Sequence, residues 1–176
     1  MKKVVYLAAG EAVISVPGCN VVYNDLYLSR DLKCDLLDVK LSDFDIVLAS
    51  PPCNFYSRAN YRRYSSNYSL LTKNLLPRIL ADLIVLGCPF IVENVINKKL
   101  MSSVDPFLKK LIAGEVLGVF YYEFGRHCYF TNVDMSAYSF KFEPSNVANV
   151  CSRKRQGSGG VNIVFSEFLN KVVNQI

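Results

Sequence analysis

Cys53 is the residue whose type and position most clearly suggest chemistry. It follows Pro51 and Pro52 at the end of the apolar run 45–49. Proline has no N–H and a fixed φ, so the backbone must leave a sheet at Pro51, and Cys53 is expected on a stiff loop after a buried strand. The C-terminal edge of an open α/β sheet is where ligands bind, which makes this thiol a candidate nucleophile. The alternative role for a lone cysteine is that of a small buried hydrophobic residue.

Two further motifs follow the cysteine along the chain. The motif around the cysteine is Pro51-Pro52-Cys53-Asn54-Phe55-Tyr56-Ser57. The first motif that follows it is Glu93-Asn94-Val95, after the apolar run 89–92, and the second is the segment 125–132, which contains Arg126. In this order they resemble the Pro-Pro-Cys-Gln-x-Phe-Ser motif, the Glu-Asn-Val motif and the arginine-containing strand of the cytosine-C5 DNA methyltransferases. The resemblance extends from Val4 to the last helix. It is to a short, phage- or virus-type member without a full target-recognition domain.

The resemblance implies a role for each motif residue. Cys53 would add to cytosine C6 and so make C5 nucleophilic, helped by nearby positive charge or backbone N–H groups that favour the thiolate. Glu93 would hydrogen-bond or protonate cytosine N3, Asn94 would orient the Cys53 loop, and Arg126 would hold the cytosine O2. His127, the only histidine, is expected to support the structure. The target base must be flipped out or single-stranded to reach such a site.

S-adenosylmethionine is the cofactor that the resemblance implies. The family reads Phe-x-Gly-x-Gly after the first strand, whereas this chain has Ala8, Gly10 and Ala12, so we expect weak cofactor binding. An acidic residue at the end of the second strand can bind ribose hydroxyls, although Asn-Asp is also common in turns. Asp35 or Asp38 would approach the adenine amino group. The candidate cofactor-binding residues are Ala8, Gly10, Asp25, Asp35 and Pro51.

Two basic clusters suggest an anionic partner for a chain of net charge +5. Guanidinium groups can bind phosphates and tyrosines can stack on bases, which indicates DNA, either single-stranded or with a flipped cytosine. Each cluster alone is equally consistent with a solvated loop. The first cluster is Arg58, Arg62 and Arg63 among Tyr56, Tyr61, Tyr64 and Tyr68, and the second is Arg153, Lys154 and Arg155. A homodimer or a partner subunit is a possible source of target recognition.

Length and composition narrow the class of protein. The 176 residues fit a single catalytic domain, 1–176, that buries its core without disulfides or metals. The six cysteines lack paired CxxC spacing, which argues against a metal site and suggests reduced thiols in the cytoplasm, or in the host cytoplasm if the protein is viral. No apolar run reaches the roughly 18 residues of a membrane span.

The pattern of apolar residues predicts an α/β fold, and the resemblance implies that it is of the S-adenosylmethionine-dependent methyltransferase (Rossmann-like) type. We expect a mostly parallel seven-stranded sheet with an antiparallel edge and helices on both faces. The first crossover is short, so its helix should be stunted. Predicted strands span 2–8, 20–23, 45–49, 89–95, 116–123 and 127–132. Predicted helices span 70–86, 105–113 and 164–175. Residues 57–69 are predicted to form a mobile loop that closes over substrate.

Two other functions remain open. An amino-methyltransferase carries Asp/Asn/Ser-Pro-Pro-aromatic, which Ser50-Pro51-Pro52 fits, but Cys53 stands in the aromatic position. A protein of the same fold that binds nucleic acid or a partner, and has lost cofactor affinity, would also explain Ala8 and Ala12. A rise in melting temperature with S-adenosylmethionine separates the enzyme from this silent protein.

Overall fold

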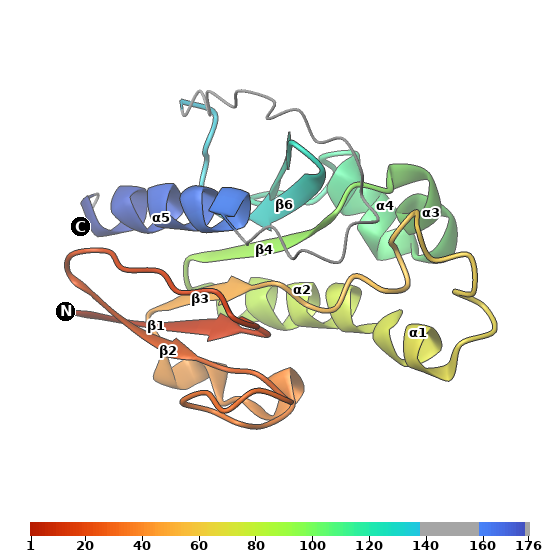
Figure 1. The fold of residues 1–176 in the computed structure, drawn as a ribbon. Coiled ribbons are helices and arrows are strands. Elements are labelled where there is room, and N and C mark those ends of the chain that lie inside the picture. Colours follow the sequence, from red (N-terminus) through yellow and green to blue (C-terminus); the bar gives the residue numbers. More distant parts are fainter. Residues whose placement is uncertain (138–158, 175–176) are drawn as a thin grey trace.

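The computed structural model describes residues 1–137 and 159–174, and side chains from 163 onward in the second range. These residues form one mixed, mostly parallel sheet in the order β2-β1-β3-β4-β6-β5 (Figure 1). The first four strands pair in parallel, whereas β6 pairs antiparallel with both β4 and β5. The strands are β1 (Lys2–Leu7), β2 (Cys19–Tyr23), β3 (Ile46–Ala49), β4 (Phe90–Val95), β5 (Phe120–Phe124) and β6 (His127–Thr131).

The predicted α/β class and the antiparallel edge are confirmed. The described residues contain six strands rather than seven, because each predicted strand segment forms one strand and no further segment joins the sheet. The strand predicted from residue 116 begins only at Phe120, after a left-handed turn at Gly118 (φ 74°). Gly118 allows this turn without the steric penalty that a Cβ would add.

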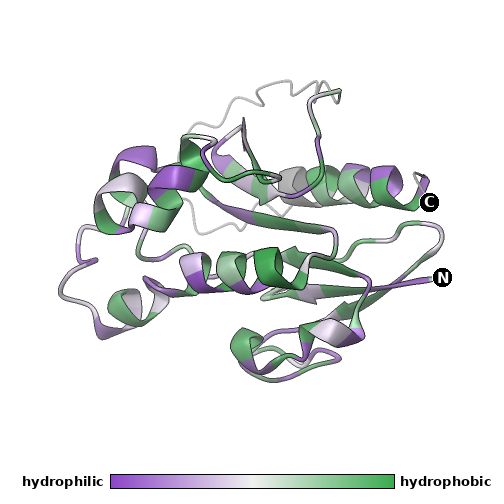
Figure 2. Cartoon of the chain, turned by 180° about the vertical axis from the view of Figure 1, so that it is seen from behind, coloured by the Kyte–Doolittle hydropathy of each residue, from purple (hydrophilic) through white to green (hydrophobic). Residues whose placement is uncertain are grey.

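Helices cover both faces of the sheet, as predicted. The helices are α1 (Asn67–Thr72), α2 (Leu75–Leu86), α3 (Lys98–Val104), α4 (Pro106–Ile112) and α5 (Gly159–Asn174). Along each strand successive side chains point to opposite faces. Val5, Val47 and Val92 therefore pack in the core beneath α2, α3 and α4, whereas Val4 and Ile46 pack with α5. Figure 2 shows apolar and polar residues alternating along α5, as expected for a helix with one face on the sheet.

The helices differ from the prediction in two places, whereas a third helix is confirmed. The predicted helix 70–86 is divided into α1 and α2, with Pro77 in the first turn of α2, where its missing N–H costs nothing. The helix predicted after Asp105 is confirmed as α4, since the Asp105 carboxylate accepts from the Phe107 and Leu108 N–H groups at 2.8 and 3.0 Å. α3 was not predicted, and it begins at the Lys98-Lys99 pair.

The connection from β1 to β2 contains no helix, so the predicted stunted helix is wrong. Its residues run as an irregular segment whose Ala12, Ile14 and Val16 are buried in the same core as α5. Arg30 fixes this segment because its guanidinium donates to the Gly10 carbonyl (Nε, 2.7 Å) and to the Ala12 carbonyl (3.3 Å). The C-terminal helix thus covers the sheet face that a crossover helix would otherwise help to cover.

None of the helices in the described ranges combines the length and the apolar character needed to cross a membrane.

Candidate active site

The loop after β3 carries Cys53 and is anchored by two buried aromatic rings. The Ser50 N–H still donates to the Leu7 carbonyl at 3.0 Å, and the chain then leaves the sheet at the prolines. Phe55 and Tyr56 are fully buried, and the Tyr56 hydroxyl donates to the Lys73 carbonyl at 2.7 Å. Cys53 itself is partly exposed, so the structure presents a thiol on a fixed loop.

The end of β4 holds this loop at two points. The Asn94 side chain is completely buried, and its amide donates to the Pro51 carbonyl at 3.1 Å. The Asn97 amide donates to the Tyr56 carbonyl at 2.8 Å. Asn94 therefore orients the Cys53 loop, as the sequence suggested. Asn97 was missed, although a polar residue so soon after the Glu-Asn-Val motif was an available signal.

Glu93 lies in β4 with 9% of its surface exposed. Its carboxyl is hydrogen-bonded to the Ser50 hydroxyl, which lies 3.1 Å from the Tyr6 hydroxyl. One Glu93 oxygen lies 3.6 Å from His127 Nε2. Burial raises the pKa of Glu93 to about 7, against a smaller lowering by Ser50. Glu93 is therefore protonated below neutral pH and can give or take a proton. The roles of Ser50 and Tyr6 were missed, and their side-chain contact depends on the packing of β1 against β3.

Cys53 and Glu93 are close enough to interact electrostatically. Burial raises the pKa of the Cys53 thiol, and the charge of Glu93 raises it further. A neighbouring positive charge was expected to favour the Cys53 thiolate. Among the described residues, burial and the charge of Glu93 oppose its formation instead. In the free protein Cys53 is a thiol at neutral pH, and a protonated Glu93 opposes its ionisation less than a charged one.

Arg126 lies in the turn between β5 and β6. Because β6 runs antiparallel to β4, with His127 opposite Val95, this turn is at the same edge of the sheet as the Cys53 loop. The Arg126 carbonyl accepts from the Ile96 N–H at 3.1 Å, and its side chain is exposed. Burial, together with the charge of Arg126, lowers the pKa of His127, which keeps the imidazole neutral. The structure thus brings Cys53, Glu93 and Arg126 to one edge.

A cavity of about 520 Å³ lies beside the Cys53 loop, within the size range of ligand pockets. Three of the predicted cofactor-binding residues line it, namely Ala8, Asp25 and Asp35, whereas Gly10 and Pro51 are not among its lining residues. Of the two aspartates proposed to approach the adenine, Asp35 lines this cavity, whereas Asp38 is exposed and is not among its lining residues. Its remaining lining residues are Asn24, Leu26, Tyr27, Leu36, Ser50, Pro52, Tyr68, Leu71, Thr72 and Leu75.

The turn after β1 is held in an unusual conformation at the rim of this cavity. Ala8 has a φ of 52°, a left-handed conformation that an L-residue other than glycine adopts at a cost. The Gly10 N–H donates to the Asp25 carboxylate at 3.0 Å. Burial acts to raise the pKa of Asp25, but hydrogen bonds from the Leu28, Tyr27 and Gly10 N–H groups and the charge of Arg30 lower it overall. Asp25 is thus an ionised acceptor at the cavity.

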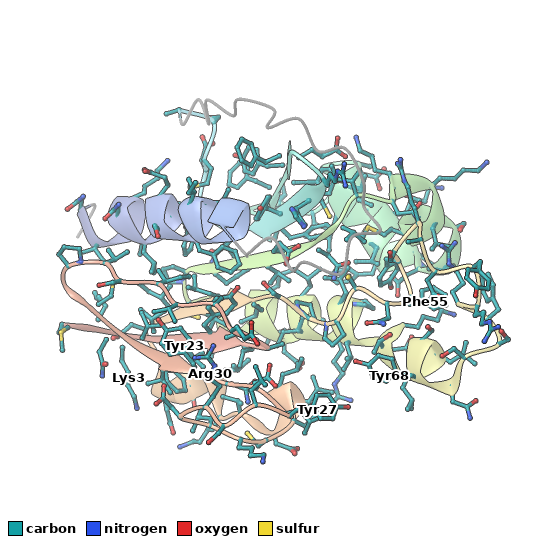
Figure 3. The ribbon with its side chains drawn as sticks, in the orientation of Figure 1. Lys3, Tyr23, Tyr27, Arg30, Phe55 and Tyr68 are labelled. Carbon is teal, nitrogen blue, oxygen red and sulfur yellow. The ribbon has the colours of Figure 1, made fainter. Side chains whose placement is uncertain are left out.

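Two tyrosines that the sequence analysis did not assign to this site flank the cavity. Tyr27, on the segment after β2, is 70% exposed, and Tyr68, in α1, is 43% exposed. Tyr68 interacts electrostatically with Tyr27, Asp25 and Cys53, and Figure 3 shows the two tyrosines on neighbouring parts of the molecule. The position of Tyr27 two residues after Asp25 was a possible signal. The position of Tyr68 depends on how α1 packs.

The basic loop after Cys53 is only partly available for binding. Arg58 and Arg62 are exposed, and the Arg62 guanidinium lies over the Tyr61 ring at 5.4 Å. Arg63 is half-buried and donates to the Ser57 carbonyl at 2.6 Å. Tyr56 is fully buried and cannot stack on a base, so that prediction is wrong, whereas Tyr61 and Tyr64 are largely exposed. Arg153, Lys154 and Arg155 lie outside the described residues.

Comparison with known proteins adds no assignment. No protein-family model matches this chain, and no curated protein matches it. Over residues 1–137 and 159–174, no three His, Cys, Asp or Glu side chains are grouped so that they could hold a metal ion.

Proposed function

We propose that this chain is a DNA (cytosine-5)-methyltransferase that uses S-adenosylmethionine and a covalent Cys53 adduct. The observation that carries the proposal is the arrangement of residues at the C-terminal ends of β3 and β4. There a partly exposed thiol on an anchored loop lies within electrostatic reach of a buried glutamate, and Asn94 ties the loop to the same strand. This arrangement has a nucleophile and a proton donor for one substrate ring.

Each residue has a distinct part in the proposed reaction. The Cys53 thiol gives its proton to water, its sulfur forms a bond to cytosine C6, and the electron pair of the C5–C6 double bond becomes available at C5. Glu93 in its protonated form donates to N3 and so accepts charge that develops on the ring. Asn94 keeps the loop in place, and Arg126 at the turn is available for the cytosine O2. Once C5 carries the methyl group, it loses its proton to water, the C5–C6 double bond forms again as the bond between sulfur and C6 breaks, and N3 returns its proton to Glu93.

The cavity beside Cys53 fits the nucleoside part of S-adenosylmethionine. Asp25 supplies an ionised acceptor for ribose hydroxyls, and Asp35 supplies one for an adenine amino group. Tyr27 and Tyr68 offer aromatic rings for the adenine in place of the aromatic residue that Ala8 replaces. When bound, the cofactor supplies the methyl group. The irregular segment after Gly10 offers no helix N-terminus to an anionic group, which supports the expectation of weak binding.

A silent nucleic-acid-binding protein of the same fold is the second candidate. It is favoured by one observation, the raised pKa of Cys53, because a protonated thiol is a poor nucleophile. An amino-methyltransferase is less well supported, because Cys53 takes the place of the aromatic residue after the two prolines.

The product identifies the reaction. Incubation of the protein with S-adenosylmethionine and single-stranded DNA should yield 5-methylcytosine, detected by mass spectrometry of the digested nucleosides. Cys53→Ser should give none. N4-methylcytosine or N6-methyladenine would indicate the amino-methyltransferase. An unmethylated product, with no rise in melting temperature in the presence of the cofactor, would favour the silent protein.

Tyr68 should contribute to cofactor binding. A ring stacked on a base contributes about 1–3 kcal/mol, so Tyr68→Ala should weaken S-adenosylmethionine binding by roughly tenfold or more. Titration calorimetry measures this difference directly. Tyr61→Ala is the matched control, since Tyr61 is 86% exposed and does not line the cavity. Equal affinities of the two variants would exclude Tyr68 from the binding site, and submicromolar affinity of the unmodified protein would contradict weak binding.

A further inference from the structure

The three residues after β4 join the Cys53 loop to the turn between β5 and β6. The Ile96 N–H donates to the Arg126 carbonyl at 3.1 Å, and the Asn97 amide donates to the Tyr56 carbonyl at 2.8 Å. Lys98 follows directly and is exposed. The exposed cations Arg58, Lys98 and Arg126 therefore come from three segments that are hydrogen-bonded to one another beside the thiol.

Glu123 in β5 lies among these cations. Its Oε1 atom accepts from the Tyr121 hydroxyl at 2.7 Å and lies 3.0 Å from Lys98 Nζ. The positive charge of Arg58 also acts on the Glu123 carboxylate. Burial raises the pKa of Glu123, but the Tyr121 hydrogen bond, the hydrogen bond and charge of Lys98, and the charge of Arg58 outweigh that effect and lower it. An anionic oxygen is thus held by a hydroxyl and two cations, which are the groups that bind phosphate in protein–DNA contacts.

We propose that Arg58 and Lys98 form a phosphate-binding rim for single-stranded DNA next to the turn that carries Arg126, and that Glu123 occupies a phosphate position in the free protein. The inference rests on the proposed function, because a strand crossing this rim would deliver a base to Cys53. It extends that function by adding Lys98 and by assigning Glu123 a competing role. One carboxylate against two cations leaves the rim with an excess of positive charge, which suits a polyanion.

The effect of Lys98 can be measured on binding alone, without cofactor. Fluorescence anisotropy with a labelled single-stranded oligonucleotide of mixed sequence gives the slope of log affinity against log salt concentration. Each lost phosphate contact on a single strand lowers the magnitude of this slope by about 0.7. Lys98→Gln should show that change. Lys40→Gln, the same change of charge at an exposed, ion-paired lysine before the N-terminal end of β3, should leave the slope unaltered.

Glu123→Gln should change the affinity for the oligonucleotide in the opposite direction. Removing the competing carboxylate frees Lys98 and Arg58, so this variant should bind the oligonucleotide more tightly than the unmodified protein, a result that loss of folding cannot imitate. Weaker or unchanged binding by Glu123→Gln, or equal slopes for the two lysine variants, would overturn the proposal. Stronger binding to polyglutamate than to DNA would identify an acidic protein partner instead. If the protein methylates cytosine but Lys98→Gln leaves the salt slope unchanged, the rim is refuted and the proposed enzymatic function stands. If the protein does not methylate cytosine but Lys98→Gln lowers the slope, the rim stands and the enzymatic function is refuted.

Discussion

DNA that contains 5-fluorocytosine should become covalently attached to Cys53 in the presence of S-adenosylmethionine. Fluorine cannot leave C5 as a proton does, so the bond between the Cys53 sulfur and C6 would persist after methyl transfer. The product is a band of lower mobility on a denaturing gel. Cys53→Ser should abolish it completely, because a serine hydroxyl ionises far less readily than a thiol.

Cys88→Ser is the matched control for this experiment. Cys88 is another partly exposed thiol, located between α2 and β4, and its replacement should leave the cross-link unchanged. Mass spectrometry of the tryptic peptides would locate the attached base. Attachment that persists in Cys53→Ser would reject the nucleophile assignment. A cross-link that forms equally well without the cofactor would show that the thiol reacts by another route.

Glu93→Gln should make the protein more stable at neutral and alkaline pH. The pKa of Glu93 is about 7 in the folded protein and near 4.5 in the unfolded chain, so between these values only the folded state binds the proton. The contribution of Glu93 to stability is therefore complete below pH 4.5 and is lost as the pH rises to 7. This loss amounts to roughly 3 kcal/mol. Glutamine resembles the protonated acid at every pH, so the difference between the two proteins should grow over this interval.

Urea denaturation at a series of pH values between 4 and 8 measures the effect. Glu123→Gln is the control, because the pKa of Glu123 is lowered rather than raised, so Glu123 does not add to the loss of stability over the interval in which Glu93 titrates. Parallel stability curves for Glu93→Gln and the unmodified protein would contradict a raised pKa. Glu93→Gln should also accelerate alkylation of Cys53 by iodoacetamide above pH 7, since the Glu93 charge that raises the pKa of the thiol is gone.

The strands and the residues at their ends could be predicted because the signals are local. The apolar runs set the strands, and Pro51 and Pro52 set the point at which the chain leaves the sheet. The division between α1 and α2 was not predictable from periodicity, because apolar residues continue through 70–76 at helical spacing.

The contacts of the site were harder to predict because they join residues far apart in the chain. Tyr6 meets Ser50 across 44 positions, and Tyr68 approaches Asp25 only because α1 packs near the segment after β2. Nothing near Tyr6 in sequence distinguishes it from a core aromatic. The raised pKa of Cys53 likewise comes from burial, which the loop sequence alone does not fix.

The position of α5 determines when this protein can fold. Phe165 packs against Tyr6 with ring centroids 5.1 Å apart, which joins nearly the last element of the chain to the first strand (Figure 1). During synthesis this face of β1 and β3 stays largely uncovered until α5 leaves the ribosome. Contacts of such long sequence separation slow folding, and the exposed apolar face invites association in the meantime. Chains that stop before α5 should therefore aggregate rather than persist as a smaller domain, so that the soluble molecules should be those that contain α5.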